Sequence, residues 1–415
     1  MTMAEKKDKL IKHATVILAG SFVGNVLSYL FHLVMARMLG PADYGSLVAL
    51  MALIVVLNVP LTTVQTILTK EIAVLNARNE NGKAKTLFLR YIKILGILGA
   101  IALFALLALS GIIMNFLHLN SITPVFLLSL ITASTVFLVV INGALNGLQK
   151  FWGLNFSIVG TGAFKLGIAA ALVGFGLGIS GALSGVLAAT IISTLIGSLF
   201  LKSLLKEKAE KASVRDSLKY SGFVLIALIC INAFINLDVI IVKHLFSSHD
   251  AGLYGALSET GKIIFFLTSA ITLVLLPKAS EAHSLGDLKA HKRILYKTLL
   301  IVALPSFAIS AAYFAMPQFF ISLLFGKQYL QAASSLGLFA IAISFYSLIN
   351  VLVMYFISIS RKKFVIAMAA FVVLEVALFF TFHDSLQSIV TILLALMTVL
   401  FVSLFIYSLI DRKAD

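Results

Sequence analysis

The chain is dominated by apolar runs of about 20 residues, separated by short polar segments. Runs such as Ile94–Ile113 do not alternate between polar and apolar positions, whereas the strands of a membrane barrel are about ten residues long and do alternate. About 20 apolar helical residues cross a hydrocarbon layer about 30 Å thick, and a helix satisfies its own backbone hydrogen bonds there. The pattern therefore predicts an all-α integral membrane protein of about twelve spans, near residues 14–36, 44–68, 91–114, 123–145, 154–175, 179–201, 220–244, 251–275, 297–316, 334–358, 364–382 and 387–409.

Composition agrees with this prediction. Hydrophobic residues make up 60% of the chain and charged residues 12%, against about 45–50% and about 25% in soluble domains. The single cysteine, Cys230, lies inside an apolar run. It excludes disulfides within the chain and a multi-cysteine metal site, so we expect no bound metal.

The net charge of +15 has a simple explanation in the arrangement of the basic residues. Most Lys and Arg residues fall on alternate connections, while the opposite connections hold only Arg37, Lys243 and Lys327. This asymmetry is the positive-inside pattern, and it predicts a multi-pass protein of the cytoplasmic membrane with both termini in the cytoplasm. Nucleic acid is not needed to explain the charge, and the basic loops are expected to attract anionic membrane lipids.

The span pattern divides into two similar halves. A long polar connection, residues 202–219, follows the sixth predicted span. We therefore predict an N-terminal lobe of six helices over 1–206 and a C-terminal lobe of six over 207–415. The segments Ala36–Leu50 and Val242–Ser258 are alike, because each has a cation at the end of a span, a polar turn, and Tyr-Gly opening the next helix. Repeats of this kind are a common transporter plan.

Several predicted spans carry polar residues on one helical face. Asn25 and His32 lie on the first span with Ser28, Asn142 lies on the fourth, and Asn236 lies on the seventh with Asn232. Spacings of three, four and seven put each set on one side of its helix. Hydrogen bonding between helices explains any one of these residues. The recurrence over several spans of both halves favours a water-filled cavity between the halves.

Ionisable residues at mid-span depth are the sharpest signals, because a charge there requires a partner or water. Lys165, in the fifth span, has no opposite charge within its own helix and is the first candidate for a cation that binds an anionic substrate. Glu259 and Lys262 are spaced to neutralise one another in the eighth span, although Lys262 is also a candidate cavity cation. Glu375, in the eleventh span, is a candidate proton or sodium site, but a hydrogen bond to a neighbour is the interpretation that we favour.

Three further residues complete the candidate set. Asp238 follows Asn236 by two positions, so on a regular helix it faces away from Asn236, and pairing with Lys243 is one role for it. Arg37 and Lys243 end corresponding spans, where snorkelling to the interface and contact with a phosphate group are both possible roles. With Glu259 and Glu375, Asp238 forms the set of candidate residues for coupling to H⁺ or Na⁺.

The chain carries no recognisable enzyme motif. There is no P-loop, no zincin motif and no nucleophile elbow, and each of these motifs is needed for its chemistry. We therefore predict that the protein is not an enzyme, has no catalytic residues, and uses no cofactor beyond a coupling ion.

The segment GSFVGNVLSYLFHLVMARMLGPADYGSLVAL resembles the opening of oligosaccharide and polysaccharide flippases, the Wzx-like branch of the superfamily that also holds the MATE exporters. Later segments resemble the same family: INGALNGLQKFWGLNFSIVGTGAFKLGIAAALVGFGLGISGAL, DAGLYGAL, LLFGKQYLQAAS and YFISISRKK. The resemblance implies two six-helix bundles around a central cavity and alternating access. It also implies an isoprenoid-diphosphate-linked saccharide as substrate, with a polysaccharide polymerase or glycosyltransferase as a possible partner.

Two alternatives remain open. One is a MATE-like exporter of amphipathic cations, but MATE exporters often have a carboxylate in the first span, where this chain has Asn25. The other is a non-transporting scaffold for polysaccharide enzymes, which would tolerate loss of Lys165 and Lys262. Lipid II flippases of the same superfamily typically have two more spans than the pattern predicts here.

Overall fold

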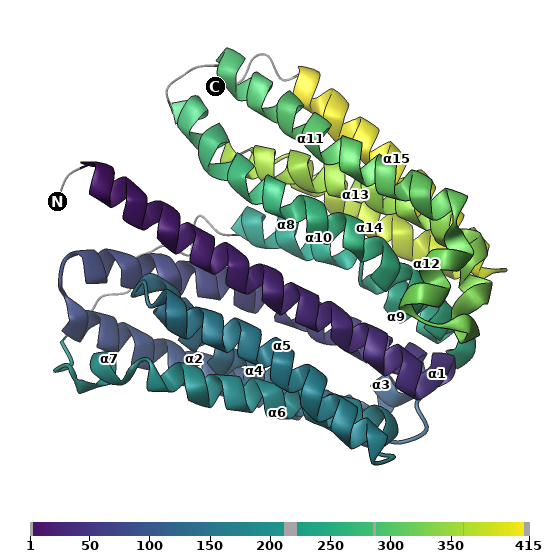
Figure 1. Ribbon diagram of the computed structural model, residues 1–415, viewed down its shortest axis with the longest axis horizontal. Coiled ribbons are helices and arrows are strands. Elements are labelled where there is room, and N and C mark those ends of the chain that lie inside the picture. The colour runs from purple at the N-terminus through teal and green to yellow at the C-terminus, as the bar shows by residue number, and fades with distance from the viewer. Residues whose placement is uncertain (1–2, 211–221, 285–287, 360, 411–415) are drawn as a thin grey trace. The chain divides into compact units, whose positions relative to one another are not determined.

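The computed structural model describes residues 3–210, 222–284, 288–359 and 361–410, without the side chains of 3–18, 270, 273–274, 276–284, 288–290 and 410. Every regular element in these ranges is a helix (Figure 1), which confirms the predicted all-α fold. Contacts divide the chain into two compact units, Met1–Ser221 and Gly222–Asp415. The predicted lobe boundary after residue 206 lies earlier in the same connection. The basic residues Lys211, Arg215, Lys219, Arg412 and Lys413, used for the orientation prediction, lie outside the described residues.

Unit 1 is built around the long helix α1. Its elements are α1 Met3–Ala77, α2 Asn81–Ala108, α3 Ser110–Phe116, α4 Thr123–Gly147, α5 Phe151–Gly174, α6 Gly178–Leu199 and α7 Lys202–Lys206. The helix α1 is interrupted at Gly40, whose φ of 76° and ψ of 170° are outside the helical region. Glycine reaches a positive φ without steric cost, and Pro41 follows it. The two parts of α1 on either side of Gly40 are therefore the first two predicted spans.

Small residues allow α1 and α5 to approach closely. A Cβ atom on Gly24 would lie 2.7 Å from a side-chain carbon of Ile158, and one on Gly162 would lie 2.8 Å from Leu27 Cβ. These distances leave no room for a side chain, so the two backbones approach in the way that small residues permit in membrane helices. Close packing of α5 against α1 is therefore the structural role of Gly162. This contact also determines where Lys165, three residues further along α5, meets α1.

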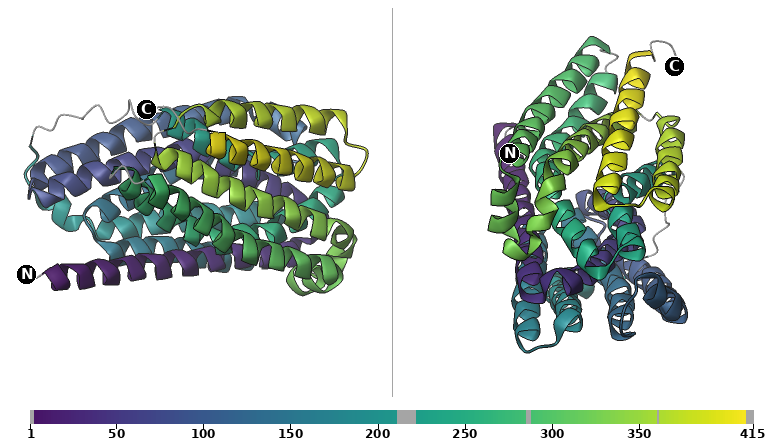
Figure 2. Two further views of the ribbon diagram at one scale, coloured as in Figure 1. Left: turned by 90° about the horizontal axis from the view of Figure 1, so that it is seen from above. Right: turned by 90° about the vertical axis from the view of Figure 1, so that its right-hand side faces the viewer.

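Unit 2 contains the remaining helices. They are α8 Gly222–Ala233, α9 Leu237–Leu245, α10 Ser248–Ser284, α11 Leu288–Ala315, α12 Pro317–Leu324, the 3₁₀ helix η2 Lys327–Ala332, α13 Ala333–Ser358, α14 Phe364–Thr381 and α15 Leu386–Ile410. The helix α13 is more deeply buried than α11, α14 and α15, with 83% of the apolar window in Lys327–Ser358 buried inside the protein. Within each unit the long helices run side by side (Figure 2).

The seventh predicted span is broken, which the sequence analysis did not foresee. α8 and α9 meet at an angle of 44°, and residues 234–236 between them form a turn. Side chains satisfy the carbonyl groups that the break leaves without helical partners. Asn236 Nδ2 donates to the carbonyl of Asn232 at 2.8 Å, and the Tyr346 hydroxyl donates to the carbonyl of Ile231 at 3.0 Å. The turn also invalidates the regular-helix argument that placed Asp238 opposite Asn236.

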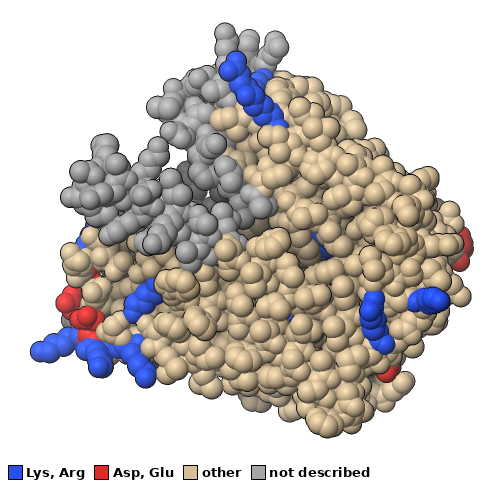
Figure 3. All heavy atoms as spheres, in the orientation of Figure 1, with Lys and Arg blue, Asp and Glu red and all other residues tan. Residues whose placement is uncertain are grey.

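Among the described residues, nine helices are long and apolar enough to cross a membrane, or ten if the bent α8–α9 pair counts as one span. That number counts α1 once, although it contains two predicted spans, and omits α10, which carries Glu259 and Lys262. Large apolar side chains face outward along the helices, including Phe104 at 68% exposed and Ile366 at 74% exposed. Charged side chains are sparse on the face shown in Figure 3. The outer surface therefore suits lipid.

Candidate functional site

Lys165 is buried in unit 1, against the first part of α1. Its side chain is 8% exposed, and its Nζ atom donates to the Ser28 hydroxyl at 3.0 Å. The same Nζ lies 4.6 Å from the centroid of the Phe31 ring, within the range of a cation–π interaction. The close approach of α5 to α1 described above makes both contacts possible. Lys165 thus lies buried near the middle of α5, and its role in binding an anionic substrate stays a prediction.

His32 lies one helical turn beyond Ser28 and contacts the second part of α1. The Tyr44 hydroxyl and His32 Nδ1 are 3.4 Å apart, and Tyr44 is fully buried. The break at Gly40 lets the chain turn so that these two residues of one continuous element meet. Asn25 and Arg37, from the same element, are exposed on the surface of unit 1.

Asn142 stands apart from these residues, on α4. Its Oδ1 atom is buried and has no hydrogen-bond partner among the described residues, and the same holds for Asn58 Oδ1 on α1. A buried amide oxygen without a donor is unfavourable, so both atoms are positions where water or a polar ligand would bind. No contact joins Asn142 directly to Lys165 among the described hydrogen bonds.

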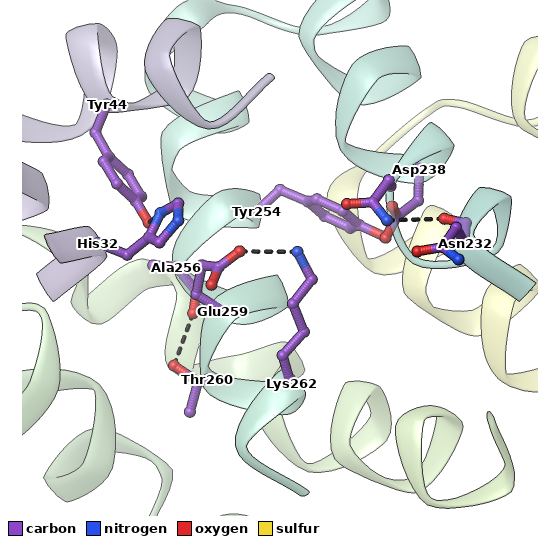
Figure 4. A network of polar contacts seen from close by, with 10 residues as sticks. His32, Tyr44, Asn232, Asp238, Tyr254, Ala256, Glu259, Thr260 and Lys262 are labelled. Carbon is purple, nitrogen blue, oxygen red and sulfur yellow. Dashed lines mark hydrogen bonds and ion pairs between the residues drawn. The ribbon is translucent and has the colours of Figure 1, made fainter. Parts of the chain in front are cut away.

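In unit 2, Glu259 and Lys262 form a buried ion pair on α10. Lys262 Nζ lies 2.8 Å from Glu259 Oε1, and the two side chains are 10% and 7% exposed, respectively. Figure 4 shows the two side chains directed toward one another within one helix. The two side chains thus form the ion pair that their spacing of three residues predicted. A substrate-binding role for Lys262 stays a prediction.

Asp238 does not have the partner considered in the sequence analysis. Its Oδ2 atom accepts a hydrogen bond of 2.9 Å from the Tyr254 hydroxyl (Figure 4), while Lys243 Nζ donates to the Ser248 hydroxyl at 2.6 Å. Asp238 is 1% exposed. The turn before α9 accounts for the difference, because it rotates Asp238 away from the direction that a continuous helix would give it.

Glu375, on α14, is a fully buried acidic side chain of unit 2. It is 0% exposed, and neither carboxylate oxygen has a hydrogen-bond partner among the described residues. The hydrogen bond to a neighbouring helix that the sequence analysis offered for it is therefore not found in the described part of the chain. Asp238 lies within electrostatic range of Glu375, and Asp238 Oδ1 is also buried without a partner in the described ranges.

Tyr44 and Tyr254 belong to the candidate site, although the sequence pattern did not identify them as site residues. Tyr44 contacts His32, and Tyr254 donates to Asp238. The available signal was the Tyr-Gly pair that opens the second helix of each half, which was interpreted only as evidence of a repeat. In each unit this tyrosine is fully buried and contacts an ionisable residue of the preceding span. Within the described residues, no group of three or more His, Cys, Asp or Glu residues is arranged to hold a metal ion.

Solved structures of membrane transporters share this fold. An inward-facing multidrug resistance MATE family transporter of the MOP superfamily aligns with a TM-score of 0.72 at 13% identity, over 95% of this chain and 100% of the other. The lipid II flippase MurJ, in an inward closed conformation, aligns with a TM-score of 0.70 at 14% identity, over 95% and 87%. A MOP superfamily transporter from Pyrococcus furiosus, described as having a binding pocket of reverse polarity, aligns with a TM-score of 0.66 at 16% identity, over 97% of each chain.

These structures are of transporters and flippases rather than enzymes. No curated protein matches the sequence. A sequence profile described as "Polysaccharide biosynthesis protein" matches residues 34–334, which is most of the chain. The resemblance found in the sequence is thereby confirmed, and the chain is a multi-pass membrane protein that belongs to the polysaccharide biosynthesis protein family, with the fold of the MOP superfamily.

Proposed function

We propose that the protein is a flippase that moves an isoprenoid-diphosphate-linked saccharide from the cytoplasmic to the outer leaflet of the cytoplasmic membrane by alternating access. The observation that carries this proposal is Lys165, a lysine that is 8% exposed near the middle of the apolar helix α5 in a member of a polysaccharide biosynthesis family. The fold is shared with MurJ, which is described as a lipid II flippase, so it is compatible with lipid-linked cargo.

The physical problem for such a protein is the charged diphosphate. A diphosphate loses its hydration in hydrocarbon, and only fixed positive charge and hydrogen-bond donors replace that loss. The ammonium group of Lys165 has three donor hydrogens, and it contacts the Ser28 hydroxyl and the Phe31 ring. A hydrogen bond from an ammonium group to a diphosphate is stronger than one to a neutral hydroxyl, so the cargo would compete with Ser28 for the ammonium group.

The other polar candidate residues of unit 1 would contact the sugars. His32 and Asn25 lie on the same element as Ser28, and an imidazole or an amide both donates and accepts hydrogen bonds. Asn142 Oδ1 is an acceptor without a partner among the described residues. Arg37, exposed beside the Gly40 break, would meet the diphosphate where it leaves the protein. These roles are part of the proposal.

Unit 2 would supply the coupling. Asp238 and Glu375 are buried carboxyl groups with three oxygens that lack partners in the described ranges, and oxygen ligands of this kind suit H⁺ or Na⁺. The Glu259–Lys262 pair lies within electrostatic range of Asp238, so a change in the geometry of the pair would change the electrostatic potential at the Asp238 carboxylate. A polymerase or glycosyltransferase that removes the flipped product is a further proposed partner.

The proposal is tested by translocation in proteoliposomes that contain a polyprenyl-diphosphate-linked oligosaccharide. The readout is access of an external lectin or glycosidase to the sugar, for wild type, Lys165→Ala and Lys83→Ala. Lys83 is a matched control, because it is a lysine of the same unit, 37% exposed and paired with Glu80. We expect protein-dependent transfer that Lys165→Ala abolishes and Lys83→Ala retains. Export of cationic drugs without any saccharide transfer would contradict the proposal.

A further inference from the structure

An apolar groove lies on the surface of unit 1 between α5 and α6. Its volume is about 500 Å³, within the range of pockets that hold small molecules. Phe156, Gly160 and Phe164 of α5 line one side. They are spaced four residues apart and so form one stripe along the helix. The glycine between the two phenylalanines forms the recess, because it has no side chain to fill the space.

α6 provides the opposite side of the groove. Ile196 and Leu199 lie on its last turns, and Phe200 follows its end. The Phe200 ring is stacked on Phe156, with centroids 6.0 Å apart. A Cβ atom on Gly153 would lie 2.8 Å from the Phe200 ring, so that glycine allows the ring to pack against the start of α5. The groove is therefore held open by defined contacts and is not a chance gap between side chains.

One end of the groove carries positive charge. Lys150 Nζ donates to the Phe200 carbonyl at 2.7 Å and to the Ser203 hydroxyl. Burial lowers the pKa of Lys150, and no described carboxylate forms an ion pair with it. The ammonium group has three donors, so one is left after these two bonds. Lys202, two residues beyond Phe200, is exposed at the same end.

We propose that this groove binds an acyl chain of an anionic phospholipid, whose phosphate is held by Lys150 and Lys202. An apolar recess that ends at two lysines matches a lipid in both shape and charge, because the chain replaces water in the groove and the phosphate accepts the remaining Lys150 donor. The occupant is a lipid of the leaflet on the side of Lys150 and Lys202. The site is independent of the cargo proposed above and lies on the lipid-facing surface of unit 1.

Binding of an anionic lipid in the groove is tested by photo-crosslinking of the protein in phosphatidylcholine vesicles. The probes are phosphatidylglycerol and phosphatidylcholine, each with a diazirine in the acyl chain, and the readout is the label on peptides of α5 and α6. Gly160→Leu fills the recess. Gly167→Leu, on the same helix, is its matched control, because a Cβ atom on Gly167 would meet no atom within 4 Å. Lys150→Gln removes the charge but keeps two donors for Phe200 and Ser203.

We expect the phosphatidylglycerol probe to label wild type about fivefold more than the phosphatidylcholine probe, since a lysine near the membrane surface contributes an attraction of about that size. Gly160→Leu should lose this label while Gly167→Leu keeps it, and Lys150→Gln should reduce the excess over phosphatidylcholine, with Lys202 retaining part of it. If Gly160→Leu melts at a lower temperature than wild type, Gly160→Ala replaces it, because its Cβ atom meets only ordinary contacts from 3.4 Å.

Equal labelling by both lipids, or unchanged labelling of Gly160→Leu, would overturn the proposal. Displacement of the phosphatidylglycerol probe by an equimolar polyprenyl phosphate would also overturn it, because the groove would then belong to the tail of the cargo.

Discussion

The two units share a helical plan but differ in the charges that they bury. Every carboxylate inside a predicted span lies in the second half, at Asp238, Glu259 and Glu375, and the predicted spans of the first half contain no acidic residue. Unit 1 instead buries Lys165 against a hydroxyl group and an aromatic ring. The interior of unit 2 therefore combines carboxylates with the buried lysines Lys243 and Lys262, whereas Lys165 is the buried charged side chain of unit 1 among the described residues.

The repeated tyrosine shows how this difference arises within a common framework. Tyr44 and Tyr254 lie near the start of the second predicted span of their half, in the second part of α1 and in α10, and both are fully buried. Tyr44 lies 3.4 Å from a histidine, whereas Tyr254 donates to a carboxylate at 2.9 Å. The tyrosine is repeated in the two halves while the group that its hydroxyl contacts changes from a base to an acid. The comparison is open to test at three places.

The largest effect is expected at the buried ion pair of unit 2. Glu259→Ala leaves Lys262 without its carboxylate at 2.8 Å and should destabilise the protein by about 3–5 kcal/mol. Thermal melting in detergent provides the measurement. The double variant Glu259→Leu with Lys262→Met removes both charges and should recover most of the loss. If the single and double variants melt alike, the pair is not the structural unit described here.

A smaller effect is expected where α1 packs on α5 in unit 1. Gly162→Ala places a Cβ atom 2.8 Å from Leu27 Cβ and should cost about 1–3 kcal/mol. Gly167→Ala on the same helix meets nothing within 4 Å and should gain up to about 1 kcal/mol from helix propensity. Melting curves of the two variants, measured side by side, provide the test. If both variants melt at a higher temperature than wild type, close packing does not explain why residue 162 is a glycine.

The third test compares the two tyrosines, and the smallest loss is expected for Tyr44. Tyr254→Phe leaves a buried carboxylate oxygen without its donor and should cost about 1–3 kcal/mol, whereas Tyr44→Phe removes a long contact and should cost about 0.5 kcal/mol. The difference in melting temperature between the two variants is the readout. Equal losses would mean that the two tyrosines have the same role, contrary to the contrast between the units.

Much of this fold could be predicted from the pattern of apolar runs, because span length is fixed by membrane thickness. The break between α8 and α9 could not, because its stability comes from the Asn236 side chain and from Tyr346, which lies 115 residues from the carbonyl that it contacts. The same break redirected Asp238 to Tyr254. Burial of Lys165 against Ser28 was partly predictable, since Ser28 lies on the polar face of the first span, but the packing of Gly24 and Gly162 decides it.

The roles of individual residues were harder to predict than the helices. The i,i+3 spacing of Glu259 and Lys262 predicted their pair, because that contact is local. Glu375 gave no such signal, since its lack of hydrogen-bond partners in the described ranges depends on neighbouring helices. The lipid groove needs a glycine between two phenylalanines on α5 and the end of α6 beside them, and such recesses are not visible in hydropathy.

The most direct test of the division between the units is binding of a polyprenyl-diphosphate-linked saccharide to the purified protein, measured with and without Na⁺ and at two pH values. We compare wild type with Lys165→Met in unit 1 and Glu375→Gln in unit 2. Lys165→Met should weaken binding at least about tenfold, since a hydrogen bond to a charged group contributes about 1.5–3 kcal/mol. Glu375→Gln should bind as wild type does but lose the response to the cation. Equal binding by Lys165→Met and wild type would contradict the account.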